Sequence, residues 1–316
     1  MNIAPSFVQS LKPRKKGYPI MKKWLAALLA ALLLPAGAVA ETIVTSFYPI
    51  YVFTLNLTSG LEDVEVHNLA APDTGCLHDY QLQTGDMKRL AGADVFLING
   101  AGMEGYLANV LSAFPQLPVV DASAGIELLC AEDHDHDHDH DHADVNAHVW
   151  LDAANARQMV SNLAEGLMAA CPDKAEQIAL NRDAYLVRLA ALDEEMKAGT
   201  AQLARRDIIT FHEAFPYFAK AYGLTVAAVV NREPSDSLSP AALAKLVRQV
   251  KDAGVPPLFV EPQYEDMAAR TLARETGAQV YELDPCVTGP EGEAALTRYE
   301  DVMRLNLQVL QEALGS

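Results

Sequence analysis

Short β-branched runs alternate with helical segments from about residue 41 onward, and this alternation constrains the fold more than any other feature. In the first half, we predict strands over 42–47, 64–69, 94–99 and 118–121 and helices over 51–59, 80–91, 103–113 and 152–170. In the second half, we predict strands over 207–211, 225–230, 257–260 and 279–283 and helices over 213–222, 241–252, 264–276 and 297–314. Because strands joined through helices form parallel sheets with right-handed crossovers, the pattern predicts two doubly wound α/β lobes.

One unusually long helix is predicted between the two halves. It begins at Asp173, where Glu176 three residues later suggests a capping box, and its apolar stripe continues to about Gly199. About 27 residues at ~1.5 Å each give a rod of ~40 Å, which is long enough to connect two lobes. We therefore expect an N-terminal lobe over 41–172, a connecting helix over 173–203 and a C-terminal lobe over 204–316.

The first forty residues have the pattern of a cleaved secretion signal. A basic segment at 21–23 precedes an apolar run at 24–34 and small residues at 38–40. The apolar run is too short and too interrupted for a membrane span, and no cysteine follows it to carry a lipid. We expect Met21 to be the true start, residues 1–40 to be a leader, and the protein to be exported.

The charge of the remaining chain is strongly negative. Six of the 24 Lys and Arg residues and none of the 42 Asp and Glu residues lie in 1–40, which leaves 18 basic against 42 acidic residues and a formal charge of −24. Such a surface repels nucleic acid and anionic membranes and attracts cations. We expect no nucleic-acid partner.

A histidine- and aspartate-rich run occupies the predicted loop 132–146. Its five alternating histidines are His134, His136, His138, His140 and His142. Imidazole and carboxylate bind borderline divalent metals, zinc foremost, and the run has no apolar side chain to bury. We expect an accessory metal-collecting loop without regular structure; the alternative is a solvated acidic loop with no binding role.

Stronger candidate ligands follow the predicted strands. His78 follows the second strand by a short loop, His148 precedes the helix at 152–170, and His212 and Asp284 directly follow strands of the second half. Doubly wound sheets bind ligands at the carboxyl ends of their strands, and three imidazoles with one carboxylate would complete a tetrahedral zinc shell. His67 lies inside a predicted strand and is interpreted as structural. For Asp284 the alternative is a Leu-Asp-Pro turn.

Four cysteines in an exported chain favour disulfides. Cys76 and Cys286 each stand two residues from a candidate ligand, so this is the pairing to test first. The alternative is that both act as thiolate ligands.

Two motifs that are typical of other functions do not support those functions here. The sequence from Gly100 to Gly105 has the GxGxxG form, but it follows the third strand and an exported protein has little access to dinucleotides. It is better explained by a tight strand-to-helix turn. His212-Glu213 begins like a zinc-protease HExxH, yet Pro216 stands where the second histidine is needed.

Six motifs occur in order along the chain: CLHDYQL around His78, NGAGMEGYL at 99–107, NAHVWLD around His148, HEAFPYFAKAYGL from His212, FVEPQY at 259–264 and LDP at 283–285. On these motifs the chain resembles the metal-binding (cluster A-I) substrate-binding proteins of zinc and manganese ABC importers. The resemblance implies two lobes bridged by one rigid helix, with the metal in the cleft between them. It also implies a monomer that delivers metal to a membrane permease and its ATPase, with His78, His148, His212 and Asp284 as ligands.

The choice of metal and of function follows from the same residues. Manganese-type members place glutamate where His212 stands, and imidazole favours Zn²⁺ over Mn²⁺. A four-ligand shell also leaves no open position for water, which suits capture and release rather than catalysis. We expect a zinc import receptor that is not an enzyme; the alternatives are a manganese-type receptor and a secreted zinc-dependent hydrolase. One departure is that Cys76-Leu77 replaces the usual proline before His78.

Overall fold

The computed structural model describes residues 40–77, 80–130, 145–230, 239–264 and 267–315. Residues 1–39 of the leader, His78 and the five histidines of the run at 132–146 lie outside these ranges. Among the described helices, none combines the length and the apolar character needed to cross a membrane.

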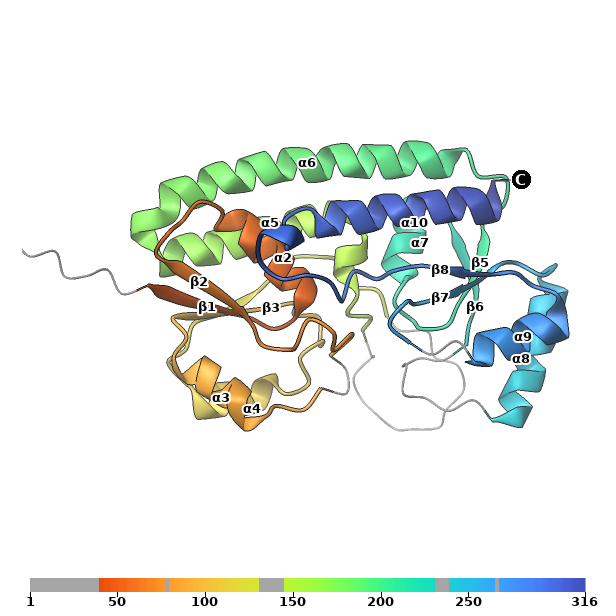
Figure 1. Cartoon of the computed structure of the whole chain (residues 1–316), viewed down its shortest axis with the longest axis horizontal. Helices are drawn as coiled ribbons and strands as arrows, with labels where there is room; N and C mark the ends of the chain where they lie inside the picture. The colour runs from red at the N-terminus through yellow and green to blue at the C-terminus, as the bar shows by residue number, and fades with distance from the viewer. Residues whose placement is uncertain (1–39, 78–79, 131–144, 231–238, 265–266, 316) are drawn as a thin grey trace, which may run out of the picture. The chain divides into compact units, whose positions relative to one another are not determined.

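The first half is built on a four-stranded parallel sheet of order β2-β1-β3-β4 (Figure 1). Its strands are β1 (Glu41–Thr45), β2 (Val64–Asn68), β3 (Val95–Ile98) and β4 (Val119–Asp121). Its helices are α2 (Tyr48–Leu57), α3 (Thr84–Ala91), α4 (Leu107–Ala113) and α5 (Ala153–Ala170), and the short 3-10 helix η1 (Val149–Leu151) precedes α5. All four residues of β3 are buried, as expected for a central strand of a parallel sheet.

The second half repeats the same strand order as β6-β5-β7-β8. Its strands are β5 (Asp207–Thr210), β6 (Thr225–Val229), β7 (Leu258–Val260) and β8 (Val280–Glu282). Its helices are α7 (Pro216–Tyr222), α8 (Pro240–Asp252), α9 (Met267–Thr276) and α10 (Arg298–Leu314), with the 3-10 helix η3 (Gly292–Ala295) before α10. The prediction of two parallel α/β sheets is confirmed. Because β5 and β7 are paired, the residues that follow these two strands lie side by side.

The long helix α6 (Ala175–Ala201) has 27 residues and joins the two halves (Figure 1). It packs against α2 and α5 of the first half and against α7 and α10 of the second. The predicted capping box at its start is wrong. Pro172 opens a 3-10 turn, η2 (Pro172–Lys174), so Lys174 becomes the N-cap and the Asp173 carboxylate accepts a hydrogen bond from Lys174 Nζ instead.

Helices α3 and α7 begin later than predicted for local reasons. Helix α3 begins at Thr84 because Gln83 and Asp86 form a capping box there, and Asp86 also accepts a hydrogen bond from the Tyr80 hydroxyl. Helix α7 begins at Pro216, since proline has no amide hydrogen and suits the first turn of a helix.

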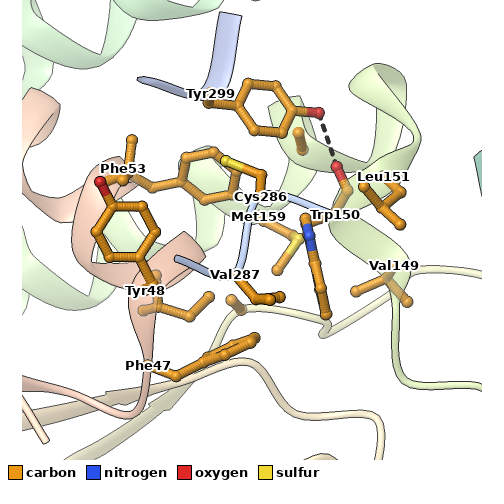
Figure 2. Packing of buried hydrophobic residues seen from close by; sticks show 14 of the residues in the cluster. Phe47, Tyr48, Phe53, Val149, Trp150, Leu151, Met159, Cys286, Val287 and Tyr299 are labelled. Carbon is orange, nitrogen blue, oxygen red and sulfur yellow. Dashed lines mark hydrogen bonds between the residues drawn. The ribbon is translucent and has the colours of Figure 1, made fainter. Parts of the chain in front are cut away.

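The main hydrophobic core takes side chains from both halves. Figure 2 shows Phe47, Tyr48 and Trp150 of the first half packed with Cys286, Val287 and Tyr299 of the second. Three hydrogen bonds cross the same region: Tyr48 OH donates to Pro290 O (2.7 Å), Trp150 Nε1 donates to Pro285 O (2.8 Å), and Tyr299 OH donates to Trp150 O (2.7 Å). The chain from Ala40 onward is accordingly one compact unit.

A second, smaller core lies within the second half. It contains Ile209 of β5, Leu258 of β7, Val250 of α8 and Leu272 of α9, and it is separate from the main core. The sheet edge that carries His212 is therefore supported by packing of its own.

Candidate metal centre

Cys76, His148 and His212 converge at the junction of the two halves. Each offers one potential ligand atom, and these atoms all lie within 4.8 Å of one another. Cys76 Sγ lies 3.5 Å from His148 Nε2, and the two imidazole rings meet edge to face with centroids 4.8 Å apart. Both histidines are buried, with 2% of their surface exposed. Two imidazoles and one sulfur form a donor set of the zinc type.

Asn146 orients the His148 ring. Its side-chain oxygen accepts the backbone N–H of His148 (3.0 Å) and lies 3.2 Å from His148 Nδ1. Its amide nitrogen donates to the carbonyl of Glu213 (2.7 Å), which settles which end of the amide faces the histidine. Because an amide oxygen only accepts, Nδ1 carries the proton and Nε2, on the side of Cys76, carries the lone pair.

Glu261 orients the His212 ring in the same way. Glu261 directly follows β7, is 3% exposed, and places Oε1 2.8 Å from His212 Nδ1. Gln263 Nε2 donates to the other oxygen of Glu261 (3.1 Å) and steadies the carboxylate. A carboxylate that accepts Nδ1–H fixes the tautomer and makes Nε2 a more basic ligand.

Cys76 reaches the cluster through a turn that favours glycine. Gly75 has φ +81°, and a Cβ atom there would stand 2.7 Å from the hydroxyl of Tyr264. The same hydroxyl lies 3.4 Å from the backbone nitrogen of Cys76, which donates to it. Leu77, the next residue, is fully buried in the main core. The hydrogen bond of the Cys76 backbone and the burial of the Leu77 side chain thus fix the position of Cys76 in the loop after β2.

Asp284 has a structural role in this conformation. Its Oδ1 accepts the backbone N–H of Cys286 (2.8 Å) and its Oδ2 accepts a hydrogen bond from Arg298 (2.7 Å). Burial raises the pKa of Asp284, and the Cys286 N–H and the guanidinium of Arg298 oppose that rise. Asn306 pairs with both the backbone N–H and the carbonyl of Asp284. The side chain holds the Leu-Asp-Pro turn, which is the alternative that the sequence left open.

The structure thus brings together two of the four predicted ligands, His148 and His212. Asp284 is engaged by Arg298 and is not a member of the described cluster, while His78 lies outside the described residues. His67, expected to be structural, lies in β2 beside Glu65, with His67 Nε2 3.4 Å from the carboxylate.

The predicted disulfide between Cys76 and Cys286 is not formed, because both residues are thiols. Cys286 is fully buried among apolar side chains (Figure 2), and this burial raises the pKa of its thiol well above the ordinary value. Only Cys76 is placed beside the histidines among the four cysteines, all of which the structure describes. The two cysteines that the sequence treated as a pair therefore have different surroundings.

Sequence reasoning missed Glu261 and Asn146 as positioning residues. Glu261 directly follows a predicted strand, so the rule that selected His212 and Asp284 could also have selected it. Asn146 gave a weaker signal, since nothing but its position two residues before His148 marks it.

The glycine-rich segment after β3 forms the tight turn that we predicted. Gly100 has φ +79°, and a Cβ atom there would collide with the Asp121 carboxylate. The backbone N–H groups of Asn99 and Gly100 donate to Glu104 (2.8 and 3.1 Å), a buried carboxylate that occupies the place where a phosphate would bind.

Comparison with known proteins agrees with this architecture. The family model described as zinc-uptake complex component A, periplasmic, matches residues 43–313. The high-affinity zinc uptake system protein ZnuA of Bacillus subtilis is 32% identical over 281 residues, which cover 86% of this chain and 87% of that protein.

Two comparisons involve a longer protein. The zinc-binding lipoprotein AdcA of Streptococcus pneumoniae is 30% identical over 278 residues, which cover 85% of this chain but 55% of AdcA. The crystal structure of Zn(II)-bound AdcA from the same species superposes with a TM-score of 0.73 at 28% identity, over 88% of this chain and 58% of that one. This chain therefore spans about half the length of AdcA. With a family-model match over residues 43–313 and a relative that is 32% identical and covered to 87% of its length, the chain belongs to the family of the periplasmic zinc-uptake complex component A.

Proposed function

We propose that this protein is an extracytoplasmic receptor that captures Zn²⁺ and delivers it to the permease and ATPase of an ABC importer. The observation that carries the proposal is the pair His148 and His212, two buried imidazoles from different halves of the chain whose Nδ1 atoms are both held by acceptors. Family membership and the names of the zinc-uptake relatives support the transport role. The protein acts as a monomer outside the cytoplasm, after removal of the leader at 1–40.

Zinc is favoured over manganese by the atoms of the cluster. Mn²⁺ prefers carboxylate, carbonyl and water oxygens, whereas nitrogen and sulfur ligands favour Zn²⁺. The carboxylate of Glu261 faces Nδ1 of His212 and so serves the imidazole as its hydrogen-bond acceptor. A manganese-type receptor is the second candidate, since a solved structure of this architecture at 27% identity is a complex with Mn²⁺.

The ligand set that we propose contains His148, His212 and His78, with a fourth ligand from one of two positions. Asp284 is the fourth ligand that the family resemblance implies, and Cys76 is the one that the geometry of the cluster supports. Four protein ligands would leave no position for a reacting water, so we propose binding and release rather than hydrolysis.

Release requires that one half withdraw a ligand from the other. His148 is tied to the second half through Asn146, and its neighbour Trp150 hydrogen-bonds to Pro285. Because these contacts surround the site, the permease need only disturb the junction locally to open the shell. The membrane complex would therefore supply the free energy of release.

Competition with a zinc chelator tests the function. The wild-type chain should hold one tightly bound zinc, and His148→Ala or His212→Ala should weaken binding by more than about 100-fold, because each removes a ligand rather than an outer partner. His67→Ala is the matched control and should bind zinc as the wild type does. Equal affinity in His148→Ala and the wild type, or no tight zinc in either, would contradict the proposal.

The histidine run is proposed to act as an accessory collector. Deletion of residues 133–142 should lower the total number of bound zinc ions and leave the single tight one in place. Loss of the tight ion in the deletion variant, measured by the same competition, would move the principal site into the run.

A further inference from the structure

We propose that Cys76 binds the metal as a thiolate, in place of the carboxylate of Asp284, so that the receptor has a mixed sulfur and nitrogen site. This inference rests on the proposed function and names one of its ligands.

The first support is distance. In a tetrahedral zinc site with ordinary Zn–S and Zn–N bonds, the sulfur and a neighbouring nitrogen stand about 3.6 Å apart. Cys76 Sγ and His148 Nε2 are 3.5 Å apart, and His212 contributes a third atom within the same 4.8 Å group. Cys76 Sγ and His148 Nε2 therefore already have the spacing that a shared metal ion requires, and the ligand atom of His212 lies close enough to join them after a small shift.

The second support is the orientation of the two histidines. Asn146 and Glu261 hold Nδ1 of His148 and His212, so each ring directs Nε2 as its ligand atom. His148 Nε2 is the atom that lies beside Cys76 Sγ. A metal bound by this nitrogen would stand within reach of the sulfur without movement of the ring.

The third support is that Asp284, the alternative ligand, already accepts hydrogen bonds from other groups. Both oxygens of Asp284 are occupied, by the Cys286 amide and by Arg298. A metal bound to Asp284 would compete for these oxygens with Arg298, whose side chain is only 27% exposed, and with the amide that holds the Leu-Asp-Pro turn. Cys76 needs no such rearrangement, because Gly75 and Tyr264 already hold its backbone.

The chemistry of the step is simple. The Cys76 thiol loses its proton to solvent, and the resulting sulfur lone pair forms the bond to the metal. Among the described residues, the donor set would then be one thiolate and two imidazoles. Such a set is softer than the family's carboxylate-containing set and should discriminate more strongly against Mn²⁺.

Cobalt substitution tests the assignment in the full chain, purified under reducing conditions. Co²⁺ bound to a thiolate shows an intense near-ultraviolet charge-transfer band that nitrogen and oxygen ligands do not produce. We expect the band in the wild-type chain, its loss in Cys76→Ser, and its persistence in Cys130→Ser and Asp284→Asn. Zinc affinity should fall by more than about 100-fold in Cys76→Ser and remain unchanged in Cys130→Ser.

A second measurement needs no variant of the site. Bound zinc should protect one thiol of the wild-type chain from alkylation, and peptide mapping should identify it as Cys76. A chain that binds zinc tightly without the cobalt band, or that protects no thiol at Cys76, would overturn this inference and leave the receptor function intact. A chain that binds neither metal would instead overturn the receptor function.

Discussion

Glu261 accepts a hydrogen bond from His212 and thereby orients the imidazole ring that would bind the metal. Its Oε1 atom lies 2.8 Å from His212 Nδ1, in a position with 3% exposure. Glu261→Ala should lower zinc affinity by about 10- to 100-fold, because the ring loses its orientation and its basicity. Glu261→Gln keeps an acceptor for Nδ1–H and should lose less. Competition titrations should show this order, with the exposed Glu282→Ala unchanged; equal losses in both Glu261 variants would show that the charge alone matters.

Glu104 gives the protein a pH-dependent stability that is independent of the metal. Burial raises the pKa of Glu104 from 4.5 to about 7, so the folded state binds this proton more tightly than the unfolded state does. Its contribution to the free energy of unfolding is therefore highest at low pH. That contribution falls by up to about 3 kcal/mol as the pH rises from 4.5 through 7.

Glu104→Gln should remove this pH dependence. The amide of glutamine can accept only one of the two backbone N–H groups of Asn99 and Gly100, so the variant should lose about 1–3 kcal/mol at pH 5. The difference from the wild type should shrink between pH 5 and pH 8 in urea unfolding. Glu127→Gln, at an exposed position, serves as the control; a difference that stays constant with pH would show that Glu104 titrates normally.

At the scale of elements, the loop after β2 depends on one glycine. Gly75 and Gly60 both have positive φ, of +81° and +78°, but only a Cβ at Gly75 would meet another side chain, Tyr264. Alanine at either position should cost about 1–2 kcal/mol of backbone strain. Gly75→Ala should also displace Cys76 and weaken zinc binding, whereas Gly60→Ala should not. Thermal unfolding with zinc titration separates the two effects, and similar zinc affinities in both variants would contradict the role of the Tyr264 contact.

The elements were predictable because their signals are local. Alternation of apolar residues marks strands and helices, and both sheets and α6 lie close to where periodicity placed them. The start of a helix depends on a few atoms, and here Gln83 of α3 and Pro172 before α6 decided it. Periodicity carries no information about such capping contacts.

The site was predictable only in part for a different reason. His148 and His212 follow from residue type and position at the ends of elements. The engagement of Asp284 by Arg298, and the approach of Cys76 to His148, depend on contacts between residues 14 and 72 positions apart in the sequence. No local sequence pattern shows that Asp284 is paired with Arg298 while Cys76 lies beside His148.

At the scale of the molecule, the two halves are joined by a shared core as well as by α6. Tyr299 of α10 is fully buried and donates its hydroxyl hydrogen to the Trp150 carbonyl, two residues from His148 (Figure 2). Tyr299→Phe should lower the free energy of unfolding by about 1–3 kcal/mol, because the buried carbonyl loses this donor.

Tyr281→Phe is the matched control for that change. Tyr281 donates a hydrogen bond to Gln279 at an exposed position. Tyr281→Phe should therefore lower the free energy of unfolding by no more than about 0.5 kcal/mol. Chemical unfolding followed by tryptophan fluorescence measures both variants. Equal destabilisation by the two changes would mean that the junction contributes no more than a surface contact does.

The small antiparallel bridge between Cys130 and Val145 has a practical consequence. Asn146 N also donates to Leu129 O (2.8 Å), so Cys130 and Val145 lie side by side in space. Val145 stands three residues before His148. A folded protein with adjacent termini could be spliced between Cys130 and Val145 without stretching the frame. A fluorescent protein inserted there would be anchored three residues from His148, at the edge of the candidate metal centre.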